Sequence, residues 1–310
     1  MKFLKSIKDL KIFYYQKLPF FLRRVMNNPV TDSDTPLSLQ IEPTNNCNLR
    51  CISCSRSRSL RPIGYMDFSL FQKIIDNAAE IGIRRVHLYL HGEPMLHPRI
   101  MDMFKFIKKR GLAISMATNG MLLDEKKIHE LLNSGVNSSD YITFSILGYS
   151  KAVHERIMRG VKHETVLNNV LNLIKLRGEF KVNGPIIETV FYKMNENIHE
   201  SNQFKKYWEP IVDHVHPVEE ISKQFSSYGT NNNQVDPREK TCRNLWERMT
   251  IFWDGNVTTC IADLDGEINL GNLKDKTIKD IWDCKELLNI KILHKQKEFE
   301  KLKLCSRCDW

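Results

Sequence analysis

The 310-residue sequence lacks any run of about 18 apolar residues, so it predicts no transmembrane helix. It also predicts no secretory signal, because charges run through the first ten residues and no small-residue cleavage site follows an apolar stretch. Its composition, 42% hydrophobic and 27% charged, excludes disordered, collagen-like and low-complexity proteins. We therefore expect a cytoplasmic protein with one large domain, alone or with a small companion.

Excess positive charge is nearly absent outside the N-terminus. The formal net charge is +9, but residues 1–25 hold seven lysines and arginines against one aspartate and so account for +6. Because the excess does not spread along the chain, the sequence does not favour a nucleic-acid-binding surface. We assign the basic segment to an N-terminal extension, residues 1–36.

Three of the eight cysteines fall within eight residues, in the stretch CNLRCISC at 47–54. In a reducing compartment such spacing indicates a metal site or catalysis, and thiolates favour zinc, copper(I) or iron–sulfur clusters. A structural zinc site needs four ligands, but this loop contains no histidine, and the nearest downstream are His87 and His91. Three thiolates on a cubane cluster leave one iron open, and an external amine and carboxylate can chelate it.

The triplet Cys47, Cys51 and Cys54 lies on a predicted strand-to-helix loop. Residues 37–43 alternate in polarity and end at a proline, which indicates a strand. Residues 68–82 carry apolar side chains at helical spacing and end in a glycine. α/β barrels place their chemistry on loops of this kind.

A CxxxCxxC motif directly after a first strand resembles the signature of the radical S-adenosylmethionine (SAM) superfamily. The next predicted strand, 86–91, ends in Gly92-Glu93-Pro94, which resembles the family's GGEP-type motif. The resemblance implies that the triplet holds a 4Fe–4S cluster whose open iron is chelated by SAM. It also implies that the Gly-Glu-Pro stretch binds the amino group of SAM's methionine.

Softer matches follow along the chain. Asn119 lies in a Thr-Asn-Gly sequence that resembles the end of the family's third strand. Ser145 matches a serine that tends to contact SAM, and Arg159 matches an arginine that neutralises the SAM carboxylate in some members. Leu147 stands in place of the family's usual aspartate. Each match has an ordinary alternative, which is a turn at Asn119, a strand hydrogen bond at Ser145 and a solvated charge at Arg159.

Six strand candidates alternate with helical stretches. The strands are 37–43, 86–91, 112–117, 141–146, 185–191 and 211–216, and the helices are 68–81, 98–110, 124–134, 163–177 and 199–208. This alternation predicts an α/β fold with a parallel sheet and outer helices. The resemblance implies a partial (β/α)6 TIM-like barrel over 37–218. The polar residues 219–241 indicate a linker.

Beyond the linker, four cysteines form a C-x17-C…C-x2-C pattern, Cys242, Cys260, Cys305 and Cys308. With a predicted hairpin turning at Asp254-Gly255, residues 242–310 resemble the small α+β SPASM or "twitch" domain, and the cysteine pattern is similar to that of the inosamine dehydrogenase of aminoglycoside biosynthesis. The resemblance implies a closed auxiliary 4Fe–4S cluster that transfers electrons, the second cluster of the chain. Four thiolates also suit zinc. Cys284 is left over and is expected to pack as a small hydrophobe.

The resemblance implies an oxidoreductase that cleaves SAM reductively to a 5′-deoxyadenosyl radical and abstracts hydrogen from its substrate. A two-electron oxidation of a carbohydrate or aminocyclitol alcohol fits, with the auxiliary cluster accepting an electron. Asp263 is a candidate general base, as is Asp265, although both are equally consistent with hairpin-loop carboxylates in water. Peptide or protein side-chain maturation is the alternative enzyme activity, and a non-catalytic zinc-ribbon binding protein is the alternative of another class.

The expected partners are a small-molecule or peptide substrate and a flavodoxin- or ferredoxin-type reductant. The basic N-terminal extension has three interpretations, namely a helix packed on the barrel, a docking site for the acidic reductant, or a membrane-surface contact. Because metal binding contributes to folding, we expect metal-free protein to be less stable and residues 242–310 to lose order first.

Overall fold

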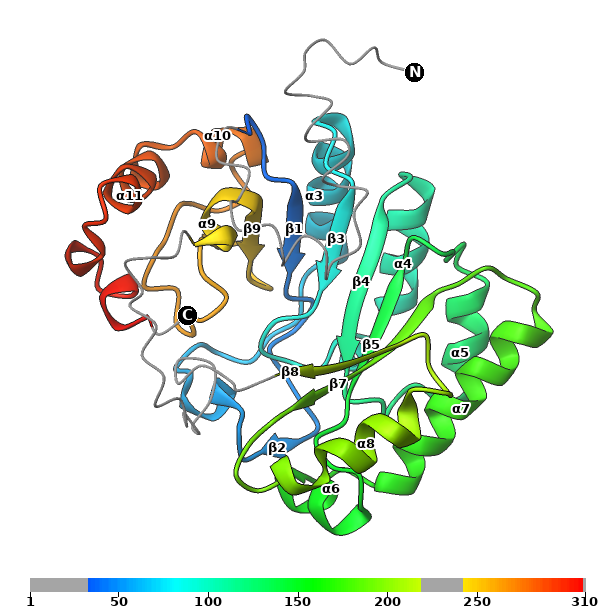
Figure 1. Ribbon diagram of the computed structural model, residues 1–310. Coiled ribbons are helices and arrows are strands. Elements are labelled where there is room, and N and C mark those ends of the chain that lie inside the picture. The colour runs from blue at the N-terminus through cyan, green and yellow to red at the C-terminus, as the bar shows by residue number, and fades with distance from the viewer. Residues whose placement is uncertain (1–32, 219–241, 309–310) are drawn as a thin grey trace.

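The computed structural model describes residues 33–218 and 242–308, which form one eight-stranded sheet with helices on its outer side (Figure 1). Six strands run parallel in the order β1-β3-β4-β5-β7-β8, which confirms the predicted α/β partial barrel. Most of the N-terminal extension and the whole predicted linker lie outside the described residues. No helix in the described ranges is both long enough and apolar enough to cross a bilayer.

The predicted barrel elements all occur, with their ends shifted by a few residues. The strands are β1 (Ser38–Ile41), β3 (Arg85–Leu88), β4 (Ala113–Thr118), β5 (Tyr141–Ser145), β7 (Ile186–Tyr192) and β8 (His214–Val218). The helices are α3 (Phe68–Glu80), α4 (Ile100–Lys109), α5 (Glu125–Leu132), α7 (His163–Glu179) and α8 (Ser201–Trp208).

Several short elements were not predicted. Helix α6 (Lys151–Ile157) precedes α7. Between these two helices, strand β6 (Met158–Arg159) pairs with β2 (Arg50–Cys51) in a separate two-stranded sheet. The described residues also contain short 3₁₀ helices. These are η1 (Ser55–Arg58), η2 (Pro94–Leu96), η3 (Ile198–Glu200), η5 (Phe299–Lys301) and η6 (Cys305–Arg307).

Local side chains fix where the helices begin and end. Asp67 accepts hydrogen bonds from the backbone N–H groups at the start of α3, and Asp124 does the same for α5. Such N-caps satisfy backbone donors that have no partner within the first turn. Beyond α3, Gly82 has a φ of +84°, a conformation that glycine adopts without strain. Because these signals are local in sequence, the predicted helix positions hold.

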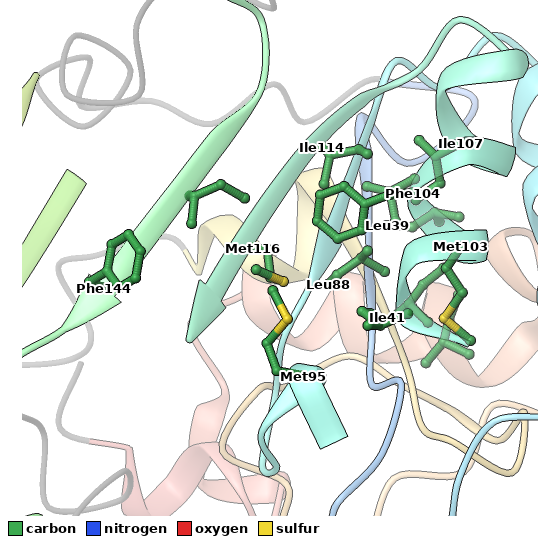
Figure 2. Close-up of a cluster of buried hydrophobic side chains, with 14 of the residues drawn as sticks. Leu39, Ile41, Leu88, Met95, Met103, Phe104, Ile107, Ile114, Met116 and Phe144 are labelled. Carbon is green, nitrogen blue, oxygen red and sulfur yellow. The ribbon is translucent and has the colours of Figure 1, made fainter. Parts of the chain in front are cut away.

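The two faces of the sheet differ in chemistry. On the outer face, Leu39 and Ile114 are fully buried and lie close to Phe104 and Ile107 of α4 (Figure 2). Alternate strand residues point to the opposite side, because successive side chains of a strand alternate. We call this side the inner face; it is largely polar and carries Gln40, His87, Ser115, Thr143, Glu188 and His216.

The C-terminal region joins the same sheet. Strand β9 (Arg248–Ile251) pairs in parallel with β1, and β10 (Val257–Thr258) pairs antiparallel with β9 across the predicted hairpin. The pairing of β9 with β1 was not predicted. Three helices complete the region, α9 (Arg243–Glu247), α10 (Ile278–Trp282) and α11 (Lys285–Lys295), and α10 contacts α3 of the barrel.

Candidate active site

The cysteines of the first triplet lie on the loop between β1 and α3, at the carboxyl-terminal edge of the sheet. Burial raises the pKa of the Cys47 thiol to about 11, and burial together with the neighbouring Cys54 and Cys47 raises that of Cys51 to about 12. The backbone N–H of Leu49 points to Cys47 Sγ at 3.5 Å. Cys54 and Cys47 both disfavour ionisation of Cys51, so the three thiols lie near one another, and a bound metal cation would relieve this repulsion.

The Gly92-Glu93-Pro94 loop packs directly against the residues that precede Cys47. A methyl group on Gly92 would lie 2.2 Å from the carbonyl oxygen of Thr44 and 2.6 Å from that of Asn46, so only glycine fits. The backbone N–H of Glu93 donates to the Asn46 carbonyl at 2.7 Å. The second motif is thus hydrogen-bonded to the segment that begins the first.

Glu93 connects the loop after β3 to the end of β4. Its buried carboxylate accepts hydrogen bonds from Thr118 Oγ1 at 2.7 Å, from Asn119 N at 2.8 Å and from Met95 N at 3.1 Å. Burial raises the pKa of this carboxyl, although the hydrogen bonds oppose the shift. The Glu93 side chain is therefore used to hold the conformation of the Gly92-Glu93-Pro94 loop.

Asn119 brings a third motif to the cysteine loop. Its side-chain amide donates to Asn48 Oδ1 at 2.8 Å, and Asn48 stands between the first two cysteines of the triplet. Asn119 Oδ1 accepts from the backbone N–H of Met121 at 3.0 Å. Asn119 is thus more than a turn residue, because it holds the end of β4 against the triplet.

Arg159 and Ser145 occupy different parts of the same edge. Arg159 of β6 is exposed and stands directly opposite the exposed Arg50 of β2, next to Cys51. Like charges opposite each other in an antiparallel pair are unfavourable, so an anion bound there would be stabilised. Ser145 is the half-buried last residue of β5, and Leu147, in the aspartate's place, is buried.

The four C-terminal cysteines come together from three segments. Cys242 precedes α9, Cys260 follows β10, and Cys305 and Cys308 begin and follow η6. Burial, together with the nearby Cys242 and Cys308, raises the pKa of Cys305 to about 12. Burial also raises the pKa of Cys260, reinforced by the other three thiols. The set predicted from spacing alone therefore gathers in space.

Other groups surround this second set. The backbone N–H of Ala262 lies 3.4 Å from Cys260 Sγ, and Nε2 of His294 lies 3.3 Å from Cys305 Sγ. Cys284 stays apart, because its sulfur accepts from Leu287 N at 3.5 Å at the start of α11 and it packs beside the apolar core. It behaves as the small hydrophobe that was expected.

The base role predicted for Asp263 is at odds with its surroundings. Asp263 is fully buried, and its carboxylate accepts hydrogen bonds from Thr258 Oγ1 at 2.7 Å, Glu267 N at 2.8 Å and Ile268 N at 3.0 Å. A carboxylate committed to three protein donors and shielded from solvent cannot reach a substrate proton. Asp265 is exposed, but it accepts from the Ser59 hydroxyl and the Leu60 N–H, so it connects the two cysteine regions.

A buried ion pair strengthens that connection. Arg61, which follows the cysteine loop, donates two 2.8 Å hydrogen bonds to the carboxylate of Glu42 at the end of β1. Burial acts to raise the pKa of Glu42, but hydrogen bonds from His91 and Arg61 outweigh it and hold that pKa below its ordinary value. His91 directly precedes the Gly-Glu-Pro motif, so the pair lies between the first two motifs.

Arg61 also reaches the C-terminal region. Its Nε donates to the Leu264 carbonyl at 2.7 Å, and its guanidinium lies 3.9 Å from the ring centre of Phe252. The carboxylate of Glu42 accepts from the backbone N–H of Trp253 at 3.3 Å. We call Glu42, Arg61 and His91 the Glu42 cluster; it joins the cysteine loop, the Gly-Glu-Pro loop and the end of β9.

Both donor sets suit iron–sulfur clusters, because each places half-buried thiols together with a backbone N–H group aimed at a sulfur. Within residues 33–218 and 242–308, no three His, Cys, Asp or Glu side chains already surround a common ion position. Cluster binding therefore requires the cysteine side chains to turn toward one another.

Comparison with known proteins decides the family. The family model for the radical SAM superfamily matches residues 41–200, about half of the chain. The chain belongs to the radical SAM superfamily. A second model, for the SPASM iron–sulfur cluster-binding domain, matches residues 242–309. These matches confirm the predicted family and establish SAM and 4Fe–4S clusters as the cofactors of this radical SAM protein.

Known relatives of this radical SAM protein differ in what they modify. It is 27% identical to a tungsten-containing aldehyde ferredoxin oxidoreductase cofactor-modifying protein of Pyrococcus furiosus over 79% of this chain and 80% of that one. It is 25% identical to a PqqA peptide cyclase of Gluconobacter oxydans over 82% and 78%. Its fold is similar to that of BtrN in complex with AdoMet and 2-DOIA, with a TM-score of 0.58, 19% identity, and coverage of 87% of this chain and 92% of that one.

Sequence reasoning missed the Glu42 cluster and the link through Asn48. Glu42 could have been found, because a charged residue at the carboxyl end of a barrel strand is where such folds place functional groups. Arg61 carries no such signal, since it is one of several arginines in a basic loop.

Proposed function

We propose that Cys47, Cys51 and Cys54 hold the SAM-binding cluster and that a second set holds the auxiliary cluster, Cys242, Cys260, Cys305 and Cys308. The observation that carries the first assignment is the pair of hydrogen bonds from Glu93 N to Asn46 O and from Asn119 to Asn48, which gathers three family motifs at one sheet edge. The second assignment rests on the gathering of four thiols from three segments.

The residues around the first set bind SAM in this proposal. The backbone of Gly92, Glu93 and Pro94 receives the amino group, because Glu93 uses its side chain within the protein. Arg159, with Arg50 opposite, neutralises the SAM carboxylate. Asn119 and Ser145 complete the site at the ends of β4 and β5.

The proposed reaction is two-electron oxidation of an alcohol carbon in a carbohydrate or aminocyclitol. When bound, SAM and its cluster supply a 5′-deoxyadenosyl radical that takes a hydrogen atom, and the auxiliary cluster supplies a one-electron acceptor. The polar inner face supports a hydroxyl-rich substrate, as does the similarity in fold and extent to BtrN, which was crystallised in complex with AdoMet and 2-DOIA. A flavodoxin- or ferredoxin-type protein serves as electron donor.

Peptide maturation is the second candidate, favoured by the similarity to a PqqA peptide cyclase. The zinc-ribbon alternative gains no support, because the matched C-terminal domain is an iron–sulfur one. An assay with separate carbohydrate and peptide panels distinguishes the two enzyme functions, since the true substrate class accelerates formation of 5′-deoxyadenosine.

The cluster assignment is tested in anaerobically purified protein reduced with dithionite. Wild type is expected to be brown, to contain iron and sulfide for two 4Fe–4S clusters, and to cleave SAM. Replacing Cys47, Cys51 and Cys54 by Ala should abolish cleavage, whereas Cys284→Ser, outside both sets, should leave it unchanged. SAM cleavage that survives the triple replacement would overturn the proposal.

A further inference from the structure

We propose that Glu188, His216 and Thr143 form a substrate-binding and proton-accepting site on the inner face of the sheet. The inference rests on the proposed function, because it names the groups that receive the alcohol. It also replaces Asp263 as the proton acceptor.

Three neighbouring strands build this site. Glu188 of β7 accepts a hydrogen bond from Thr143 Oγ1 of β5 at 2.9 Å, and its other oxygen lies 3.0 Å from Nε2 of His216 of β8. The side chain of Glu188 is 12% exposed and that of His216 is 34% exposed, so a ligand on the inner face can reach both. The group is held by rigid strands and is still accessible.

The carboxylate determines which nitrogen of His216 can take a proton. A carboxylate oxygen only accepts hydrogen bonds, so Nε2 must carry the hydrogen that points to Glu188. The other ring nitrogen, Nδ1, then holds the free lone pair. A histidine oriented in this way by a carboxylate is the arrangement that general-base catalysis uses.

Strand register places the site close to the carboxyl-terminal edge of the sheet, where SAM is proposed to bind. Glu188 stands in one row with Thr143 and Ala117, and the next residue after Ala117, Thr118, binds Glu93. His216 stands in the next inward-facing row, with Val190 and Ser145. At about 3.3 Å per residue, Glu188 lies about 7 Å from the Ser145 row along the strand. A substrate on this site would therefore lie near the sheet edge at which SAM is proposed to bind.

Charge on the inner face points to the ligand class. Arg85 is bonded to Ser115 and to the Ser139 carbonyl, and Arg248 is bonded to Gln40. Among the inward-pointing residues of the described strands, Glu188 carries the one carboxylate. It favours an ammonium or a hydroxyl group, which fits an amino alcohol such as an aminocyclitol.

The reaction balances with these groups. The alcohol carbon loses a hydrogen atom to the 5′-deoxyadenosyl radical, which becomes 5′-deoxyadenosine. The hydroxyl proton passes to Nδ1 of His216 as the C=O double bond forms, and the remaining electron leaves to the auxiliary iron–sulfur cluster. The alcohol thereby loses two electrons and two protons in total and becomes a ketone.

The test uses the anaerobic, cluster-loaded full chain with two cyclitols. These are scyllo-inosamine, which carries an amine, and scyllo-inositol, which carries a hydroxyl group at that position. H216Q keeps a donor for Glu188 but removes the imidazole, so we expect ketone formation to fall at least about 100-fold. Substrate-free SAM cleavage should stay within about twofold of wild type. E188Q should weaken calorimetric binding of scyllo-inosamine more than about tenfold. H199Q, which changes an exposed histidine of η3 instead of a strand residue, is the control and should match wild type.

Each outcome separates the two proposals. If wild type binds scyllo-inosamine in an E188Q-sensitive manner without oxidising it, the site stands and alcohol oxidation is wrong. If wild type forms the ketone and H216Q does so equally well, the site is wrong and the oxidation stands. If wild type binds neither cyclitol but a peptide drives 5′-deoxyadenosine formation, both proposals fail in favour of peptide maturation.

Discussion

Gly92 determines how closely the loop after β3 approaches the cysteine motif. In Gly92→Ala, the added methyl group meets the carbonyl oxygens of Thr44 and Asn46 at 2.2 and 2.6 Å, so the two loops must separate. We expect a loss of roughly 1–3 kcal/mol of stability, as for overpacking, and loss of iron from the first set. Iron analysis and the electron paramagnetic resonance spectrum of the reduced protein measure this.

Gly178 provides the matched control. It lies in α7, and a methyl group added there meets nothing within 4 Å. Gly178→Ala should therefore stabilise the helix by roughly 0.5–1 kcal/mol and leave both clusters in place. Full iron content in Gly92→Ala would show that the close approach is not needed.

A buried histidine pair predicts how stability depends on pH. Nδ1 of His154 lies 3.0 Å from Nδ1 of His163, and burial together with the charge of His163 lowers the pKa of His154 to about 3. The unfolded chain binds this proton near pH 6.5, so it takes up more protons than the folded protein between pH 6.5 and 3. Stability is full above pH 6.5 and is lost as pH falls through this window.

At pH 6, this linkage costs about 0.8 kcal/mol relative to alkaline pH. His154→Leu removes the titrating group, so the difference in the free energy of unfolding between pH 8 and pH 6, measured by urea denaturation, should shrink by that amount. The exposed His199, changed to Gln, is the control and should leave the difference unchanged. An unaltered pH dependence in His154→Leu contradicts the prediction.

At the scale of elements, the Glu42 cluster holds the loop after the first triplet against β9. Glu42→Gln leaves the Arg61 cation buried without its charge partner, which typically costs roughly 3–5 kcal/mol. Because Arg61 also bonds Leu264, we expect the 59–61 loop to loosen. The spectrum of the reduced first cluster with SAM should broaden or shift.

Another buried pair provides the control for this prediction. Lys108 of α4 forms a 2.7 Å ion pair with Asp140, the residue directly before β5, and this pair lies away from both cysteine sets. Asp140→Asn should destabilise the protein comparably and leave the spectrum with SAM unchanged. Identical spectra in both variants would mean that the Glu42 cluster only contributes stability.

Elements with local signals were predictable, and elements defined by distant partners were not. Helix α3 was found because its apolar residues recur at helical spacing and because Gly82, with its positive φ, follows its end. β9 pairs with β1 more than 200 residues earlier in the sequence, and no local pattern encodes that choice of neighbour. For the same reason, the short β2–β6 pair was not predicted.

At the scale of the whole molecule, the site was predicted to the extent that it depends on cysteine spacing and linear motifs. Spacing alone put Cys242 and Cys305 in one predicted thiol set, and in the structure Cys242 is near enough to raise the pKa of Cys305. Asp263 was misread because burial, which decides whether a carboxylate can exchange protons with substrate, is a tertiary property. Glu188 and His216 were not identified from the sequence, because they come together only when separate strands are placed in register.

Because β9 belongs to the barrel sheet, loss of the auxiliary cluster should release only part of the C-terminal region. In Cys305→Ala/Cys308→Ala, the thiol set loses two ligands, and residues 259–308 lose the metal contribution to folding. β9 stays paired with β1, and Leu37 and Glu42 keep their backbone bonds to Glu247 and Ile251.

Brief trypsin digestion followed by mass spectrometry should therefore cut first at the lysines of 285–303 and leave 248–251 attached to the barrel. The iron content should fall by about half. Cys284→Ser, which keeps a capping atom for α11, should resist trypsin as wild type does. First cuts within 68–110 would show instead that the auxiliary cluster stabilises the barrel itself, and the contact between α10 and α3 would then be the route by which it does so.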